Sequence, residues 1–234
     1  MDNLQPLPKK SLALGGIFIT LVLLAGALFI GHFGFFRLFG ITQISADALY
    51  LSRLVFWLCL GIVWLYSFSI EKQKLLLWKE KKYSFLLYCA SVIAVLAGLI
   101  IALGIAGGTL KKLGYDESSA RFDEILKLFR GNYFLIFFTS ITAGFVEELL
   151  FRGYLLSRME LVFKSPVIAI FLSSILFGLM HFGYGTAYQL AGPFIIGLGF
   201  AFYYWQFRNI KVVIFCHCIW DITAICAKLW LVKQ

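Results

Sequence analysis

Long apolar runs dominate this sequence and constrain its fold more than any other feature. Seven of them are about as long as a helix that crosses a hydrocarbon core of ~30 Å. They cover about residues 11–36, 48–70, 83–108, 131–156, 166–183, 187–206 and 210–232. The runs are continuous, whereas the strands of a membrane β-barrel alternate apolar and polar residues. We therefore expect an all-α protein, a polytopic transmembrane helical bundle of about seven spans that forms one domain over residues 1–234.

The composition excludes the common classes of soluble protein. Hydrophobic residues make up 61% of the chain and charged residues 14%, whereas a soluble domain has about 25% charged residues. The net charge of +9 would favour nucleic acid as the partner of a soluble protein. Here, however, Lys and Arg lie mostly between the apolar runs, where such residues set the topology and contact anionic headgroups. We expect membrane lipid, and no nucleic acid, as a partner.

The distribution of Lys and Arg between the runs predicts the orientation. With the N-terminus inside, the inside loops carry eleven of these residues and the outside loops nine. The densest block is the short connector EKQKLLLWKEKK at residues 71–82, and short basic loops stay in the cytoplasm. We expect an integral multi-pass protein of a bacterial cytoplasmic membrane, with a cytoplasmic N-terminus.

The longest connector, residues 109–130, has a helical pattern of its own. Its apolar residues recur at positions i, i+3, i+4 and i+7, namely Phe122, Ile125, Leu126 and Phe129. Asp116 could cap such a helix. The pattern predicts a short amphipathic helix in the membrane interface. It is either a plain connector or a gate beside an active site.

A few ionisable side chains lie inside the last four apolar runs. They are Glu147, Glu148, Arg152, His181, His217 and Asp221. A charged group near the bilayer centre costs roughly 2.5–3.5 kcal/mol on insertion scales, so such groups usually face the bundle interior and mark a functional site. We expect the six to share one site. Residue counting, however, places His181 deeper from the inside face than Glu147.

The spacing of these residues predicts how they pair. Glu148 and Arg152 are at i and i+4 of a helix and can form an ion pair, which leaves Glu147 as a spare carboxylate suited to act as a general base. The alternative is a buried structural network in which both glutamates share Arg152. His217 and Asp221 have the same spacing, so the carboxylate can orient the imidazole.

Three motifs in this order resemble those of a known family. Glu147-Glu148-x-x-x-Arg152, Phe177-x-x-x-His181 and His217-x-x-x-Asp221 resemble the motifs of the CPBP intramembrane proteases. That family includes the type II CAAX prenyl endopeptidases and the bacteriocin-processing or immunity proteins of the Abi group. The matched region covers about residues 131–225 and is the expected catalytic core.

The resemblance implies an intramembrane endopeptidase of the glutamic type that acts on a peptide or a membrane-anchored protein. It implies that Glu147 and His181 activate water, and that His217 and its partner Asp221 stabilise the oxyanion. Because an ionised Asp cannot donate a hydrogen bond, we expect Asp221 to orient His217. Glu148 and Arg152 would set the local charge, and Phe177 would hold the ring of His181.

Three alternatives to a metal-free protease stay open. Zinc or another divalent metal could bind His181, His217 and Glu147, although no HExxH motif is present and the resemblance implies no cofactor. The chain could also be a non-catalytic immunity or scaffold protein of the same family. A proton-coupled transporter is the third alternative, but such proteins usually show repeats in both halves.

Overall fold

The computed structural model describes residues 7–32 and 44–231, and the described residues form helices and connectors without a strand. Seven of the helical stretches are long and apolar enough to cross a membrane. The seven are Lys10–Phe29, Ala46–Ser69, Phe85–Lys112, Tyr133–Phe163, Pro166–Tyr184, Ala187–Phe207 and Ile210–Leu231. The predicted all-α transmembrane bundle is therefore confirmed, and the chain has the architecture of an integral, multi-pass membrane protein.

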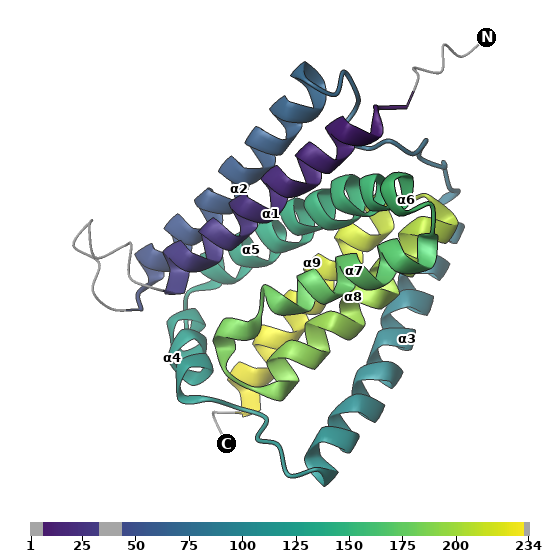
Figure 1. Cartoon of the computed structure of the whole chain (residues 1–234). Helices are drawn as coiled ribbons and strands as arrows, with labels where there is room; N and C mark the ends of the chain where they lie inside the picture. Colours follow the sequence, from purple (N-terminus) through teal and green to yellow (C-terminus); the bar gives the residue numbers. More distant parts are fainter. Residues whose placement is uncertain (1–6, 33–43, 232–234) are drawn as a thin grey trace.

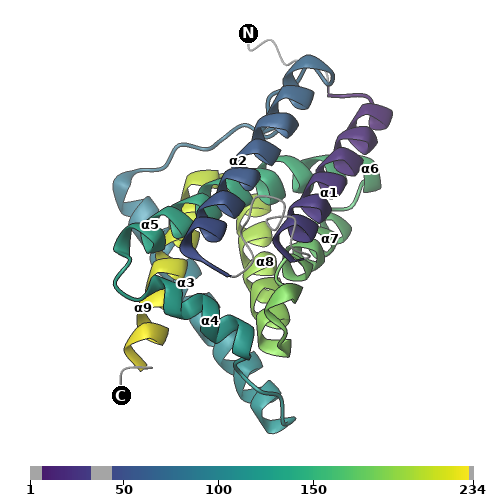
Figure 2. The ribbon, with the colours of Figure 1, turned by 90° about the vertical axis from the view of Figure 1, so that its left-hand side faces the viewer.

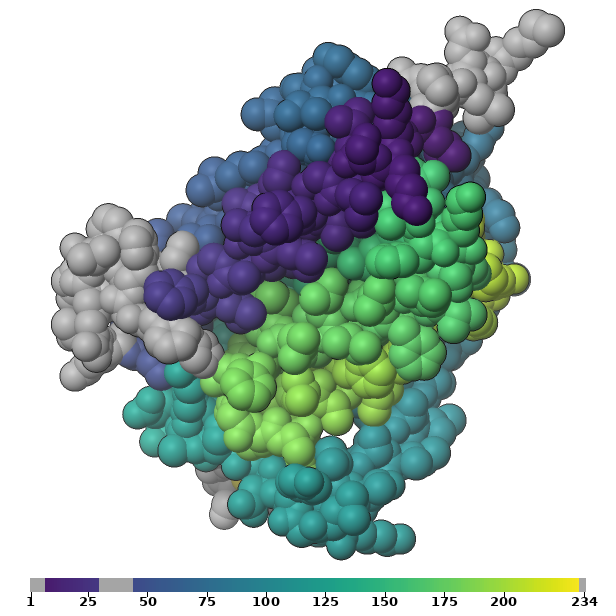
Figure 3. All heavy atoms as spheres, in the orientation of Figure 1, coloured from purple at the N-terminus to yellow at the C-terminus, as the bar shows by residue number. Residues whose placement is uncertain are grey.

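The described elements follow one another with short connections. In chain order they are α1 (Lys10–His32), α2 (Ala46–Ser69), α3 (Phe85–Lys112), α4 (Ala120–Phe129), α5 (Tyr133–Thr142), η2 (Ala143–Glu147), η3 (Leu149–Leu156), α6 (Ser157–Phe163), α7 (Pro166–Leu179), η4 (Phe182–Tyr184), α8 (Ala187–Phe207) and α9 (Ile210–Leu231). Figure 1 shows α1 and α2 side by side on one flank and α3 on the other. The space-filling view shows α1 lying against the segment that contains α6 (Figure 3).

The fourth span lies at the centre of the bundle. In an apolar stretch of 18 residues within Tyr133–Phe163, 61% of the residues are buried inside the protein. The corresponding share in α3 is 6%. The turned view shows α5 beside both α2 and α9 (Figure 2). Side chains of the fourth span therefore face protein rather than lipid, which is where ionisable residues at membrane depth are expected.

The middle of this span winds as a π-helix, in η2 and η3 on either side of Glu148. π-Helical turns are rare and occur frequently at functional sites. Gly144 lets α9 approach this turn closely, because a Cβ at this position would lie 2.3 Å from Sγ of Cys218 and 2.9 Å from the carbonyl oxygen of Ile214. The close approach brings His217, directly before Cys218 on α9, to the same depth as the π-helical segment.

The fourth span ends later in the chain than expected, and this removes the expected difference in depth between Glu147 and His181. The span continues to Phe163 instead of ending near residue 156, so Glu147 lies 16 residues before its end. His181 lies 15 residues after the start of the fifth span at Pro166. Since both distances count from the same end of the bundle, the two residues lie at similar depth. Residues 33–36 and 232 of the expected first and last spans lie outside the described residues.

The predicted amphipathic helix is present as α4, but the expected cap is wrong. The side chain of Ser119 caps α4 by accepting a hydrogen bond from the backbone N–H of Phe122, and Asp116 lies in the preceding loop. The apolar side of α4 packs on protein, because the buried Phe129 clusters with Leu135 and Ile136 of α5. This packing places α4 at one end of the bundle, over the space between the spans.

Candidate active site

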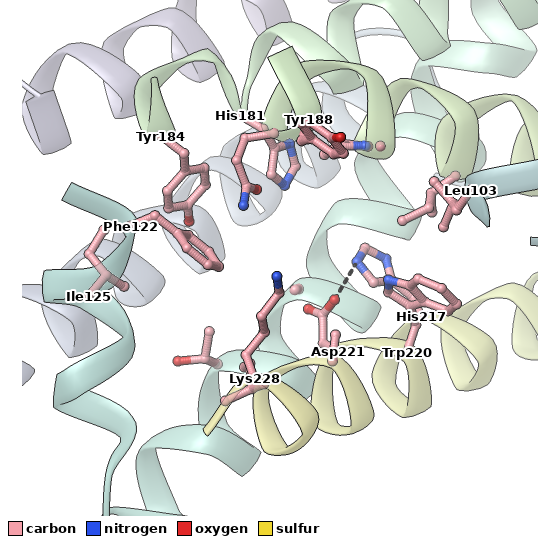
Figure 4. A pocket seen from close by; sticks show the side chains of 18 of the residues that line it. Leu103, Phe122, Ile125, His181, Tyr184, Tyr188, His217, Trp220, Asp221 and Lys228 are labelled. Carbon is pink, nitrogen blue, oxygen red and sulfur yellow. Dashed lines mark ion pairs between the residues drawn. The ribbon is translucent and has the colours of Figure 1, made fainter. Parts of the chain in front are cut away.

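One pocket lies between the spans at the end of the bundle that α4 covers. It has a volume of about 360 Å³ and is lined by residues of α2, α3, α4, α5, α7, α8 and α9 and of the π-helical segment. Glu147, His181, His217 and Asp221 all line it. In Figure 4, His181 and His217 approach the cavity from different helices, and Asp221 lies below His217. The structure thus brings the four residues predicted to be catalytic, from three spans, to one cavity.

Glu148 and Arg152 lie behind this cavity and are buried. Nη1 of Arg152 donates to Oε1 of Glu148 at 2.8 Å, so the predicted i, i+4 pair forms. The same carboxylate oxygen lies 2.7 Å from Nδ1 of His217. The sequence pattern missed this contact. The nearest carboxylate to His217 is that of Glu148, whereas Oδ1 of Asp221 lies 3.7 Å from Nε2 on the pocket side.

Three aromatic rings surround the guanidinium of Arg152. Its Cζ lies 4.3 Å from the ring centroid of Phe177, 5.6 Å from that of Phe200 and 6.0 Å from that of Phe151. A guanidinium over such ring faces is attracted by their quadrupoles. The cage fixes Arg152, which in turn fixes the carboxylate that binds His217.

His181 has one nitrogen bound and the other available. Nδ1 lies 3.0 Å from the carbonyl oxygen of Phe177, and because a carbonyl only accepts, this nitrogen carries a proton. In a neutral imidazole, Nε2 is then an acceptor. The predicted packing of Phe177 on His181 is present, with ring centroids 5.2 Å apart, and Phe177 also contacts His217 edge-on at 5.9 Å. Phe177 therefore positions both histidines.

Glu147 has a partner that lies outside the last four apolar runs. Nη1 of Arg53, on α2, lies 3.8 Å from Oε1 of Glu147, and the two side chains are 15% and 9% exposed. Arg53 also lies 5.2 Å from the ring of Phe56. A signal was present in the sequence, because Arg53 is the single charged residue in the run 48–70.

Two contacts hold α4 and the loop before it over the pocket. The hydroxyl of Ser119 donates to the carbonyl oxygen of Tyr184. Nζ of Lys228, which also lines the pocket, lies 2.5 Å from Oε1 of Glu117. Both contacts join segments more than 60 residues apart in the chain. The periodicity of residues 109–130 predicted the helix but gave no sign of these partners.

The carboxylates and histidines of the site spread around the cavity. Across residues 7–32 and 44–231, no group of three or more His, Cys, Asp or Glu side chains is placed so that it could hold a metal ion. The donor set in the pocket comprises imidazole nitrogens, carboxylate oxygens and, from Arg53 and Lys228, cationic nitrogens. This arrangement can bind and polarise water and can donate hydrogen bonds to a carbonyl oxygen.

Comparison with known protein families agrees with the motifs. Residues 129–223 match the family model described as type II CAAX prenyl endopeptidase Rce1-like. No curated protein and no solved structure matches the chain significantly. The matched segment contains all seven predicted site residues, from Glu147 to Asp221, but it does not include Arg53. The expected family resemblance is therefore confirmed over residues 129–223, which match a family of proteases, the type II CAAX prenyl endopeptidases.

Proposed function

We propose that this protein is an intramembrane endopeptidase of the glutamic type, with Glu147, His181, His217 and Asp221 as its catalytic residues. One observation carries the proposal. A general-base candidate and two histidines from three different spans line one cavity within the segment that matches a protease family. Ionisable groups at membrane depth are costly, so their convergence on a cavity favours chemistry over packing.

The first proposed step is the activation of water. Glu147 accepts a proton from a water molecule, and Nε2 of His181 accepts a hydrogen bond from the same water. The availability of Nε2 follows from the bond between Nδ1 and the carbonyl of Phe177. The resulting hydroxide attacks the carbonyl carbon of the peptide bond. Arg53 positions the carboxylate of Glu147 from the opposite helix.

The second step is stabilisation of the oxyanion and release of the amine. His217, protonated on both nitrogens, donates from Nδ1 to Glu148 and from Nε2 to the developing oxyanion. Such a donor contributes about 3 kcal/mol in comparable sites. Glu148 and Asp221 compensate the charge of the imidazolium. The C–N bond then breaks, and Glu147 returns its proton to the leaving amine, so that water is consumed and two chain ends form.

In this proposal the reaction needs neither a covalent intermediate nor a cofactor. Zinc bound by His181, His217 and Glu147 is the rival mechanism, and a chelator distinguishes the two. The substrate is a peptide or a membrane-anchored protein, and membrane lipid surrounds the bundle. We also propose that the N-terminus lies in the cytoplasm, since the basic connector at residues 71–82 follows the second span.

A cleavage assay on a peptide library tests the proposal. Purified wild-type protein in lipid nanodiscs is expected to cleave a subset of peptides, and cleavage is expected to continue after treatment with a chelator. Glu147→Gln should lose cleavage without a change in thermal unfolding. Glu124→Gln, which alters an exposed glutamate on α4, is the matched control and should cleave like the wild type.

The other outcomes each favour a different function. No cleavage by wild-type protein, with biological activity kept in Glu147→Gln, would favour the immunity or scaffold role. Proton flux in proteoliposomes that Glu147→Gln abolishes would favour a transporter. Loss of cleavage with chelator and recovery with added Zn²⁺ would favour the metal mechanism.

A further inference from the structure

The two ends of the bundle differ in charge more than the sequence suggests. We call the end formed by the start of α1 and the connectors after α2, α6 and α8 the lysine face. We call the end formed by the start of α2, the end of α3, α4 and the end of α9 the pocket face. Figure 1 places the start of α1 and α6 towards one end and α4 and the end of α9 towards the other. Counted along the sequence, the cations divide almost evenly between these ends.

Burial changes that count at the lysine face. Nine Lys side chains are exposed there among the described residues, and they are Lys9, Lys10, Lys72, Lys74, Lys79, Lys81, Lys82, Lys164 and Lys211. The three described carboxylates of this end bind inward. Glu71 pairs with the buried Arg158 at 2.8 Å. Glu80 accepts from the hydroxyl of Tyr204 and the backbone N–H of Ile210, and Glu160 accepts from Trp205. Among the described residues, the lysine face thus presents cations without exposed carboxylates.

The pocket face has the opposite balance. Four cationic side chains are exposed among its described residues, and they are Lys111, Lys112, Lys127 and Arg130. Five carboxylates are exposed with them, and they are Asp47, Asp116, Glu117, Asp123 and Glu124. Since an excess of Lys and Arg in short loops marks the cytoplasmic side, nine exposed cations against four assign the lysine face to the cytoplasm.

The pocket reaches the surface at the pocket face. Its outer lining comes from helix ends that lie there, with Leu49 at the start of α2, Leu110 at the end of α3 and Lys228 at the end of α9. Two of its polar lining residues, Glu147 and His217, lie 14 residues from the ends of their spans at this face. The cavity therefore runs from the pocket face to the middle of the fourth span, and away from the lysine face.

The walls of the entrance are largely apolar. The residues of α4 that line it are Phe122, Ile125, Leu126 and Phe129, and Trp220 of α9 lies beside His217 in Figure 4. An apolar cavity with few polar groups favours apolar side chains of a bound ligand. A peptide segment that passes α4 to reach Glu147 would therefore meet aromatic and aliphatic contacts.

We propose that the pocket opens on the non-cytoplasmic side of the membrane and that its substrate is an apolar peptide segment presented on that side. The substrate class rests on the proposed protease function, whereas the side of opening does not. A peptide bond held on the cytoplasmic side would have to cross the bundle to reach Glu147. The enzyme would thus act on peptide that has already been exported or inserted.

Cysteine labelling tests the side of opening without reference to activity. The five native cysteines (Cys59, Cys89, Cys216, Cys218 and Cys226) are replaced by alanine, and Lys112→Cys or Lys81→Cys is added. A membrane-impermeant maleimide should label Lys112→Cys in intact bacterial cells as fully as after permeabilisation. Lys81→Cys should be labelled after permeabilisation alone. The reverse pattern would overturn the proposal.

A second measurement keeps the native cysteines. Alkaline phosphatase or green fluorescent protein is fused after Gln234, beyond the end of α9 at the pocket face. An active phosphatase and a dark fluorescent protein are expected, because the first folds outside the cytoplasm and the second inside it. An inactive phosphatase with a bright fluorescent protein would place the pocket face in the cytoplasm.

Vesicles of known orientation then test the substrate class. An impermeant fluorogenic peptide with apolar residues around the cleaved bond should be hydrolysed by right-side-out vesicles and not by sealed inside-out vesicles. Cleavage by inside-out vesicles alone would overturn the proposed substrate side. No cleavage even in detergent would refute the protease function, while the labelling pattern still decides which side the pocket faces.

Discussion

Two buried arginine–glutamate pairs have their arginines six residues apart on the fourth span, and the pairs differ in how completely their polar atoms are hydrogen-bonded. Arg158 pairs with Glu71 and Arg152 pairs with Glu148, each with an N–O distance of 2.8 Å and side chains no more than 1% exposed. Chemistry and burial are thus alike in the two pairs. The pairs differ in the other hydrogen bonds that their side chains form.

Arg158 uses almost every donor that it has. Its Nε and Nη2 donate to Oε2 of Glu71, Nη2 also donates to the hydroxyl of Ser67, and the carbonyl oxygens of Lys74 and Leu75 accept from its Nη atoms. The hydroxyl of Tyr154 donates to the other oxygen of Glu71. The network ties α6 to the connector after α2, so its role is to hold the fold together.

Arg152 and Glu148 leave polar atoms without partners. Nε of Arg152 and Oε2 of Glu148 have no hydrogen-bond partner among the described residues. Oε1 of Glu148 instead serves both Arg152 and His217. Buried polar groups are usually satisfied, and exceptions point to strain or catalysis. The Arg158 network is thus nearly complete, whereas the Arg152 network beside the cavity is not, and this difference agrees with the catalytic role that we propose for His217.

The largest effect should come from breaking the complete network. Arg158→Met leaves Glu71 as an uncompensated buried charge, and we expect a loss of about 3–5 kcal/mol in the free energy of unfolding. Thermal unfolding in detergent, followed by tryptophan fluorescence, measures it. Lys211→Met, which changes an exposed lysine, should unfold like the wild type. The double variant Glu71→Gln with Arg158→Met should recover part of the loss. A stable Arg158→Met variant would contradict a structural role.

The matching change at the incomplete network should act on catalysis instead. Glu148→Gln keeps an acceptor for Arg152 and His217 but removes the charge that holds His217. We expect cleavage to fall about 10²–10³-fold, the range for loss of an oxyanion donor, with a smaller shift in unfolding temperature than Arg158→Met. Cleavage rate and unfolding temperature are measured on the same preparation. If Glu148→Gln lowered the unfolding temperature as much as Arg158→Met, the two pairs would not differ in role.

Arg53 tests whether the site extends beyond the motif region. Arg53→Gln should lower kcat about tenfold, or about 1.4 kcal/mol, and should leave KM unchanged, because the side chain positions Glu147. Arg53→Lys, which keeps the charge, should restore most of kcat. Steady-state kinetics on the best library peptide separate the two constants. An equal loss in Arg53→Lys, or a loss in KM alone, would mean that Arg53 has another role.

The sequence predicted the spans and the motif residues for a physical reason. Apolar runs and i, i+4 spacing are local properties, so Glu148–Arg152 and Phe177–His181 could be expected from the chain alone. Contacts between spans were not predictable in this way. Neither the bond from Glu148 to His217, 69 residues apart, nor the approach of Arg53 to Glu147 follows from any local pattern.

The burial of charged side chains near the span ends could not be predicted from the sequence either. Arg158 lies just beyond the expected fourth span, residues 131–156, where a loop cation would be expected, yet it is fully buried. Glu71 begins the basic connector and is also buried. Long polar side chains near helix ends can turn inward when a partner lies on another helix, and the identity of that partner depends on tertiary packing.

The smallest expected effect concerns α4, which covers the pocket. Ser119→Ala removes both the cap of α4 and the bond to Tyr184, and losing a helix cap costs about 1 kcal/mol. Amide exchange in α4 should therefore become faster, with little change in global unfolding, because α4 opens locally. Mass spectrometry of deuterium exchange measures it. Ser118→Ala is the matched control, since Ser118 bonds to Asp123 within the same segment and leaves the contact with Tyr184 intact. If both variants exchange equally fast, the bond from Ser119 to Tyr184 does not hold α4 over the pocket, and the cover depends on the Lys228–Glu117 pair and on the apolar packing of Phe129.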